Sequence, residues 1–171
     1  MSDHAASRFA QSLINAHKSG KRIAVDDDAR ALAREDAKTV MQAVAKGLGQ
    51  TPAGWKVAVI DGTPAYAPMF AKDIRPSGAH FPMIEEGYLI EIEVALKLAH
   101  DLPHRDTAYS RSEIEAACGE WVVGIELIGS RLKKSPGEAP FPAWLADSMG
   151  NAAYVTGPSV AFSAIKDGSV L

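Results

Sequence analysis

The sequence predicts an α+β fold in which helices come first and strands follow. Three observations predict it. Apolar residues recur at helical spacing over the first fifty residues, apolar and polar residues alternate over 88–98, and the stretch 121–128 is almost entirely apolar. A chain of 171 residues has room for a single hydrophobic core. We therefore expect one structural unit with a helical front and a strand-rich remainder.

The first part of the chain contains two predicted helices. Apolar residues at helical spacing predict one helix from about residue 5 to 19 and a second over 33–48, with an acidic loop at 26–28 between them. Glycine follows each helix, as is typical of a helix C-terminus. The apolar side of the second helix consists of Ala33, Ala37, Val40, Met41, Val44 and Leu48.

From Gly54 onward the pattern changes to that of strands. The segment 55–60 is rich in β-branched residues and is followed by an Asp-Gly turn signal. Three prolines argue against a helix over 63–78, so we expect a shaped loop there. The alternation over 88–98 places apolar residues at even positions, which predicts a strand.

The second half continues with short elements. The S-x-x-E sequence at 110–113 is a capping box and predicts a helix to about Cys118. The apolar stretch 121–128 is typical of a strand covered on both faces. A further strand is expected at 152–156, and a hairpin turn at 166–168 whose second strand has barely begun at the last residue.

Composition excludes several classes of protein. With 18 Lys and Arg residues against 21 Asp and Glu residues, the net charge is −3, and no positive field exists to bind nucleic acid. A single cysteine, Cys118, excludes an intramolecular disulfide. The start of the chain lacks signal-peptide features, and no apolar stretch approaches the roughly 20 residues of a membrane helix. These features predict a cytoplasmic protein without a membrane or nucleic-acid partner.

Glu126 lies inside an apolar strand, where a carboxylate needs compensation. A buried, unpaired carboxylate costs several kcal/mol, so a bound cation, a basic partner or a raised pKa is expected. Arg131 is close enough in sequence to be that partner. A structural Glu–Arg pair, or an edge strand with a wet face, explains Glu126 as well as a functional role does.

Glu91 and Glu93 project from the same side of a predicted strand, with Cα atoms roughly 6.6 Å apart. Two carboxylates ~5 Å apart repel by about 3 kcal/mol at an effective dielectric of about 20, a penalty that a shared divalent cation would reverse. Alone, such a pair is more often a solvated strand face. With Glu126 on a neighbouring strand it would form an all-oxygen site suited to Mg²⁺ or Mn²⁺. The histidines show no metal-ligand spacing, which disfavours zinc.

Lys56 and Asp147 are the candidates for proton transfer. Lys56 interrupts an apolar strand, so it either extends to the strand edge or is a partly desolvated acid or base. Asp147 precedes a Ser-Met-Gly turn, where a capping role explains it equally well. The chain contains no G-x-S-x-G, P-loop or G-x-G-x-x-G motif, which argues against serine hydrolase, nucleotide and dinucleotide chemistry.

Five blocks of the sequence follow one another in a specific order and spacing. They are GWKV at 54–57, YAPMF at 66–70, IEIEVA at 90–95 with DLP at 101–103 behind it, IELIGSR at 125–131, and LAD at 145–147 followed by YVTG at 154–157. This pattern resembles the 2-keto-4-pentenoate hydratase family of the fumarylacetoacetate hydrolase superfamily. The resemblance implies a helical N-terminal region, 1–52, packed on a mixed β-roll, 53–171. Family members are longer, so we expect a C-terminally shortened roll.

The resemblance also implies a site. Its divalent metal would be held by Glu91, Glu93 and Glu126, its motif lysine falls on Lys56, and its A-D motif ends at Asp147. From these positions we expect Lys56 and Asp147 to move protons. Arg131 and Ser148 would contact the substrate. One departure stands in the turn after Asp147, where the family has Asn and Ser and this chain has Ser-Met-Gly-Asn.

The function implied by the resemblance is that of a metal-dependent hydro-lyase. It would add water to a 2-hydroxy-2,4-dienoate in aromatic-compound catabolism, using Mg²⁺ or Mn²⁺. The alternatives are a 2-oxo-acid decarboxylase or acylpyruvate C–C hydrolase of the same superfamily, or a catalytically inactive shortened subunit. The expected partner is a small 2-oxo or 2-hydroxydienoic acid, and open apolar strand edges predict a homo-oligomer.

Overall fold

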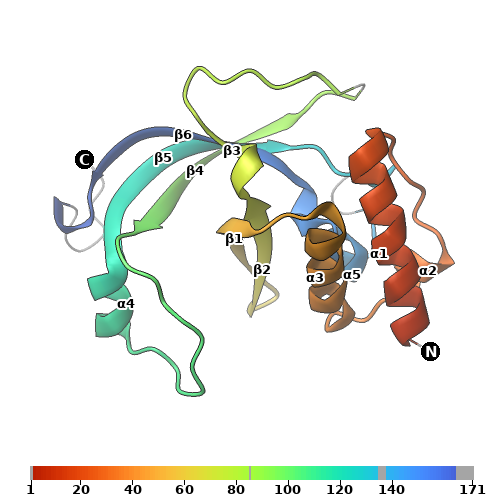
Figure 1. Ribbon diagram of the computed structural model, residues 1–171, viewed down its shortest axis with the longest axis horizontal. Coiled ribbons are helices and arrows are strands. Elements are labelled where there is room, and N and C mark those ends of the chain that lie inside the picture. Colours follow the sequence, from red (N-terminus) through yellow and green to blue (C-terminus); the bar gives the residue numbers. More distant parts are fainter. Residues whose placement is uncertain (1, 85, 135–137, 165–171) are drawn as a thin grey trace.

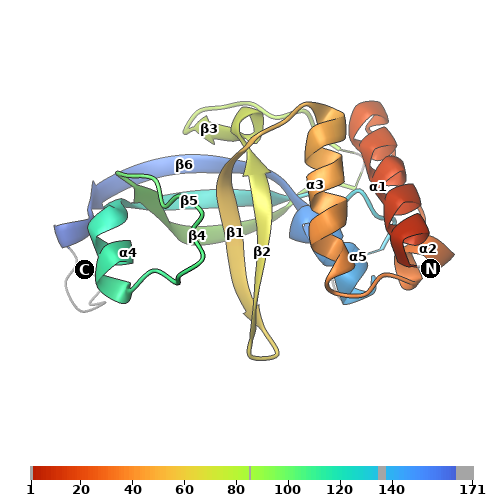
Figure 2. The ribbon, with the colours of Figure 1, turned by 60° about the horizontal axis from the view of Figure 1, so that its bottom comes forward.

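The computed structural model describes residues 2–84, 86–134 and 138–164. The helices are α1 (Ser2–Ser19), α2 (Asp27–Arg30), α3 (Asp36–Leu48), α4 (Arg111–Ala117) and α5 (Phe141–Ala146), with 3-10 turns at Ala71–Asp73, Ser148–Gly150 and Phe162–Ala164. The strands are β1 (Pro52–Ile60), β2 (Thr63–Phe70), β3 (Ile74–Pro76), β4 (Leu89–Leu98), β5 (Cys118–Ile128) and β6 (Asn151–Ala161). A group of α1, α2, α3 and α5 occupies one end of the molecule, and a curved sheet in the order β3-β6-β5-β4 occupies the other (Figure 1). The β1–β2 hairpin stands between them (Figure 2).

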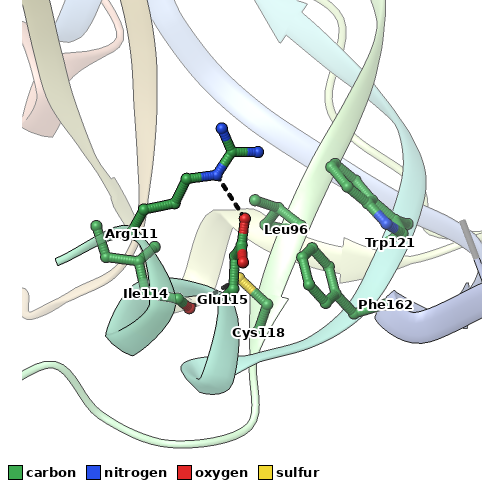
Figure 3. Close-up of a pocket in the computed structure, with 7 residues that line it drawn as sticks. All are labelled: Leu96, Arg111, Ile114, Glu115, Cys118, Trp121 and Phe162. Atoms are coloured by element: carbon green, nitrogen blue, oxygen red, sulfur yellow. Dashed lines mark hydrogen bonds and ion pairs between the residues drawn. The ribbon is translucent and has the colours of Figure 1, made fainter. Parts of the chain in front are cut away.

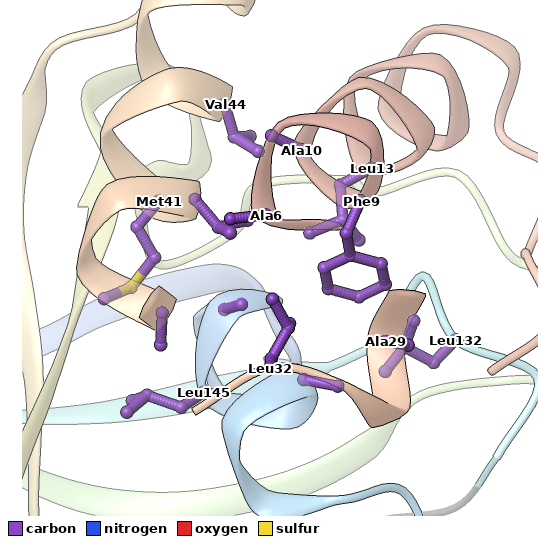
Figure 4. Close-up of a cluster of buried hydrophobic side chains, with 14 of the residues drawn as sticks. Ala6, Phe9, Ala10, Leu13, Ala29, Leu32, Met41, Val44, Leu132 and Leu145 are labelled. Carbon is purple, nitrogen blue, oxygen red and sulfur yellow. The ribbon is translucent and has the colours of Figure 1, made fainter. Parts of the chain in front are cut away.

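The hydrophobic core lies among the helices (Figure 4). α1 packs on α3 through apolar side chains at helical spacing, including Phe9 and Leu13, which are each 1% exposed. Leu145 of α5 and Met149 of the next turn belong to the same core. The core therefore anchors the chain on both sides of Asp147.

Most of the predicted elements are present. α1 and α3 correspond to the helices expected at 5–19 and 33–48, β4 to the strand at 88–98, and β6 contains the strand at 152–156. The capping box that opens α4 is also present. The hairpin turn expected at 166–168 lies outside the described residues. Within the described part of the chain, no helix combines the length and apolarity needed to cross a membrane.

Two segments expected to be loops form regular elements instead. In the acidic segment, Asp26 caps α2, and its carboxylate accepts a hydrogen bond from the Ala29 N–H at 2.9 Å. β2 replaces much of the loop expected over 63–78, because a two-stranded sheet has edge positions where the missing N–H of proline is tolerated. The turn between β1 and β2 uses Asp61 and Gly62, both left-handed, with φ of 50° and 73°.

The register of the curved sheet brings distant residues into rows. β4 and β5 pair antiparallel with Glu91 opposite Glu126 and Glu93 opposite Gly124. β5 and β6 pair antiparallel with Glu126 opposite Tyr154. Residues directly opposite each other in an antiparallel sheet project from the same face. One face of the sheet therefore carries all three glutamates and Tyr154.

The opposite face of the sheet is apolar and open to solvent. Ile92 of β4 is 81% exposed and Ile125 of β5 is 39% exposed. The expectation that 121–128 is covered on both faces is therefore wrong, because only the carboxylate-bearing face is covered. That face is turned toward the β1–β2 hairpin, since Lys56 of β1 reaches Glu126.

The imidazole of His17, near the end of α1, makes stability depend on pH. Burial, with the charges of Arg131 and Lys72, lowers the pKa of His17 from 6.5 to about 3. Between these values the unfolded chain binds a proton that the folded chain does not, so stability falls as the pH falls. We expect a loss of up to about 2 kcal/mol between pH 7 and pH 5 in urea unfolding. His17→Gln should remove this loss and His100→Gln should retain it; an unaltered pH dependence in His17→Gln would contradict the assignment.

Candidate metal centre

Three carboxylates from two adjacent strands meet on the covered face of the sheet. Glu91, Glu93 and Glu126 each offer one oxygen, and these oxygens all lie within 4.8 Å of one another. Glu126 is completely buried, Glu93 is half-buried, and the side chain of Glu91 is 50% exposed. The cluster is therefore closed at its base and open to solvent at one side. The structure brings together the three residues that the sequence predicts as metal ligands.

Lys56 enters this cluster from the hairpin. Its Nζ donates to Oε2 of Glu126 at 2.5 Å and to Oε2 of Glu91 at 3.2 Å, and its side chain is 10% exposed. The ammonium therefore lies within the cluster and does not extend to the strand edge. Burial lowers the pKa of Lys56, but hydrogen bonds and charges from Glu126 and Glu91 outweigh burial and raise it above 10.5. Lys56 is thus a protonated amine at neutral pH.

The partner of the second Glu126 oxygen is Asn151, the first residue of β6. Its Nδ2 donates to Oε1 of Glu126 at 2.8 Å, and Asn151 is 8% exposed. Arg131, the basic partner considered from sequence proximity, does not bind Glu126. Sequence reasoning missed Asn151 as a site residue. The available signal was an Asn directly before the strand predicted at 152–156, at the end of the turn that follows Asp147.

The cluster carries more negative than positive charge. Burial raises the pKa of Glu93, and the charges of Glu126 and Glu91 raise it further, against the opposing charge of Lys56. Three carboxylates surround one ammonium, which binds Glu91 and Glu126. A divalent cation would therefore relieve repulsion among the carboxylates that Lys56 alone does not. The donor atoms are all oxygens, which is the ligand set of Mg²⁺, Mn²⁺ and Ca²⁺. The residues therefore fit a hard divalent cation.

Asp147 and Arg131 form a separate buried pair. Nε of Arg131 donates to Oδ1 of Asp147 at 2.5 Å, while the Arg131 N–H and the Ser130 hydroxyl donate to Oδ2 at 2.9 and 2.8 Å. The Asp147 side chain is 0% exposed. Both of its oxygens are thus engaged, and Asp147 is not brought into the carboxylate cluster. Arg131 connects the two groups indirectly, since its Nη1 donates to the backbone carbonyl of Asn151 at 2.6 Å.

The turn between Asp147 and Asn151 has an uncommon backbone. Ser148, Met149 and Gly150 are all left-handed, with φ of 54°, 51° and 74°. Left-handed backbone in two successive non-glycine residues is strained and persists only where surrounding packing holds it. Met149 is 0% exposed in the helical core, which supplies that packing. The structure places Ser148, a predicted substrate contact, at the partly buried start of this turn.

A hollow of about 440 Å³ lies elsewhere, between α4 and the far ends of β4 and β5 (Figure 3). Its apolar wall includes Leu96 and Trp121, and Trp121 stacks on Phe162 with ring centroids 5.4 Å apart. None of the predicted site residues lines it. The two charged residues that line it, Arg111 and Glu115, pair with each other, and the predicted site residues lie in the carboxylate cluster, the Asp147–Arg131 pair and the turn that follows it.

The buried pair generates a prediction about stability. Arg131→Met should lower the free energy of unfolding by about 3–5 kcal/mol, because it leaves the Asp147 carboxylate buried without its counter-ion. Urea unfolding followed by circular dichroism measures this loss. Arg111→Met is the matched control, since Arg111 pairs with Glu115 on the exposed surface of α4 and its loss should leave the midpoint unchanged. Equal effects of the two substitutions would contradict a structural role for the Asp147–Arg131 pair.

No protein-family model matches the chain, and no curated protein matches it. Solved structures that it resembles include two of 4-oxalocrotonate decarboxylase from Pseudomonas putida G7, one complexed with magnesium and adipate and one with calcium and acetate. The TM-scores are 0.74 and 0.68, each at 17% sequence identity, and each match covers 96% of this chain and 66% of that chain. The chain therefore spans 66% of the length of those structures. The predicted fold class is confirmed: a small helical part accompanies a mixed sheet, and the similar structures share this fold.

Proposed function

We propose that this chain is a metal-dependent hydro-lyase that adds water to a 2-hydroxy-2,4-dienoate. The observation that carries the proposal is the convergence of Glu91, Glu93 and Glu126, with the Lys56 ammonium beside them. The sequence blocks that carry the family resemblance contain all four residues. The similar structures support the proposal in one further respect, since each is a complex with a divalent cation and a carboxylic acid.

The three glutamates would hold Mg²⁺ or Mn²⁺. Bound there, the cation would supply Lewis-acid stabilisation of the negative charge that develops on the 2-oxygen of the substrate. Asn151 holds one oxygen of Glu126 and so limits the orientations of that carboxylate. The side chain of Glu91 is half-exposed, so the cluster is open to solvent on this side, and a small acid can approach from there.

Lys56 is the residue we assign to proton transfer. Its ammonium carries a proton and binds Glu126 and Glu91, so it would lie close to a substrate held at the cluster, as a general acid must. For Asp147 and Arg131 we now propose positioning in place of direct proton transfer and substrate binding. Their pair holds the turn that delivers Asn151 to Glu126. Ser148 remains a predicted substrate contact.

A second candidate function is decarboxylation of a 2-oxo acid. The name of the similar structures favours it, and both reactions need charge stabilisation on the same substrate oxygen. The products separate the candidates, because decarboxylation releases CO₂ and hydration consumes water at a double bond.

Metal binding should depend on the buried glutamate. Calorimetric titration with Mn²⁺ should show binding to the unsubstituted protein, and Glu126→Gln should weaken it by about 100-fold or more, because a ligand and its charge are lost. Glu120→Gln is the matched control: Glu120 lies on the same strand and pairs with Lys97 outside the cluster. Absence of Mn²⁺ binding to the unsubstituted protein would refute the metal site.

Turnover should require both the cation and Lys56. Loss of the dienol absorbance should occur with Mg²⁺ or Mn²⁺ and stop after chelation. Glu93→Ala should abolish it, and Lys56→Met should slow it by about 10²- to 10⁴-fold, the usual contribution of a general acid. Metal-dependent CO₂ release from a 2-oxo acid would favour the second candidate. If the protein shows no metal-dependent turnover of a 2-hydroxydienoate, a 2-oxo acid or an acylpyruvate, the proposal that it is an enzyme is refuted, and an inactive subunit is indicated.

A further inference from the structure

Tyr154 has a buried hydroxyl that nothing in the described part of the chain satisfies. The residue is 3% exposed, and its Oη has no hydrogen-bond partner among the described residues. A buried hydroxyl without a partner is unfavourable by about 1–3 kcal/mol, so such groups are rare in folded proteins. The exception calls for a physical explanation.

The tyrosine lies on the carboxylate face of the sheet. It stands opposite Glu126 in the β5–β6 register, and Glu126 stands opposite Glu91. Its ring and hydroxyl extend over Gly124, where a Cβ atom would collide with them. Gly124 is itself opposite Glu93. The missing side chain at position 124 thus lets the hydroxyl reach the row of Glu93, beside the cluster.

The hydroxyl of Tyr154 is protonated at neutral pH, because burial raises its pKa above the ordinary value of about 10 for a phenol. A protonated phenol offers one donor and can bind an acceptor oxygen. The glutamates nearby are acceptors, yet neither engages the hydroxyl. The hydroxyl hydrogen is therefore available for a hydrogen bond to an acceptor oxygen of a bound ligand.

We propose that the Tyr154 hydroxyl is a substrate-binding donor, which donates a hydrogen bond to an oxygen of the carboxylic acid held at Glu91, Glu93 and Glu126. This inference rests on the proposed function and assigns it one further residue. The class of ligand is that of the proposed function: a small carboxylic acid with a second oxygen beside its carboxylate.

The test uses Tyr154→Phe in the full chain, with Mn²⁺ and oxalate as probes. Removing an unsatisfied hydroxyl should leave urea stability unchanged or slightly higher, and Mn²⁺ affinity should not change. Oxalate binding to the Mn²⁺-loaded protein, measured by calorimetry, should weaken by about 10- to 100-fold, the loss expected for a hydrogen bond to a charged group. Tyr109→Phe is the control, because that hydroxyl donates to the Pro103 carbonyl at 2.5 Å and should not affect oxalate.

The outcomes separate this inference from the proposed function. If the unsubstituted protein binds no Mn²⁺, both fail. If it binds Mn²⁺ and oxalate and Tyr154→Phe binds oxalate equally well, only the role of Tyr154 is overturned. If Tyr154→Phe instead weakens the binding of Mn²⁺ itself, the hydroxyl positions a glutamate ligand and does not bind the acid. That result also overturns the proposal.

Discussion

The ion pair between Lys56 and Glu126 is the contact on which the arrangement of the molecule depends. It joins two sheets that share no backbone hydrogen-bonded strand pair, because Lys56 belongs to the β1–β2 hairpin and Glu126 to the curved sheet. Burial raises the pKa of the Glu126 carboxyl, and the Lys56 ammonium opposes this shift, so the hairpin that supplies Lys56 stabilises the charged form of Glu126. The same contact brings a protonated amine to within hydrogen-bonding distance of two potential metal ligands.

The sequence predicted the fold class and the main helices and strands, and it failed where local signals conflict with context. Proline correctly argued against a helix over 63–78, but it could not reveal that an edge strand tolerates the missing donor. Acidic residues at 26–28 indicated a loop, while one of them caps α2. The covered face of 121–128 depends on which strands lie nearby, and periodicity carries no information about that.

The candidate site was predicted to the extent that strand alternation determines it. Alternation alone places Glu91 and Glu93 on one side of a strand, but the approach of Glu126 depends on the β4–β5 register. Closeness in sequence suggested Arg131 as the partner of Glu126, yet the chain turns away after β5 and Arg131 binds Asp147. Asn151 joins the cluster only through the folding of a chain segment 25 residues downstream of Glu126, which leaves no local pattern.

The left-handed turn after Asp147 mechanically links two buried ionic groups. Asp147 at its start holds Arg131, and Asn151 at its end holds Glu126, with Met149 fixed between them in the helical core. The two groups are joined by one strained backbone segment. The effects of substitutions in them on the free energy of unfolding will therefore not be additive. A thermodynamic cycle across Arg131 and Glu126 should show a coupling energy, although no hydrogen bond or ion pair between these two side chains is present in the described structure. The site and the helical core should consequently lose order together and not as separate units.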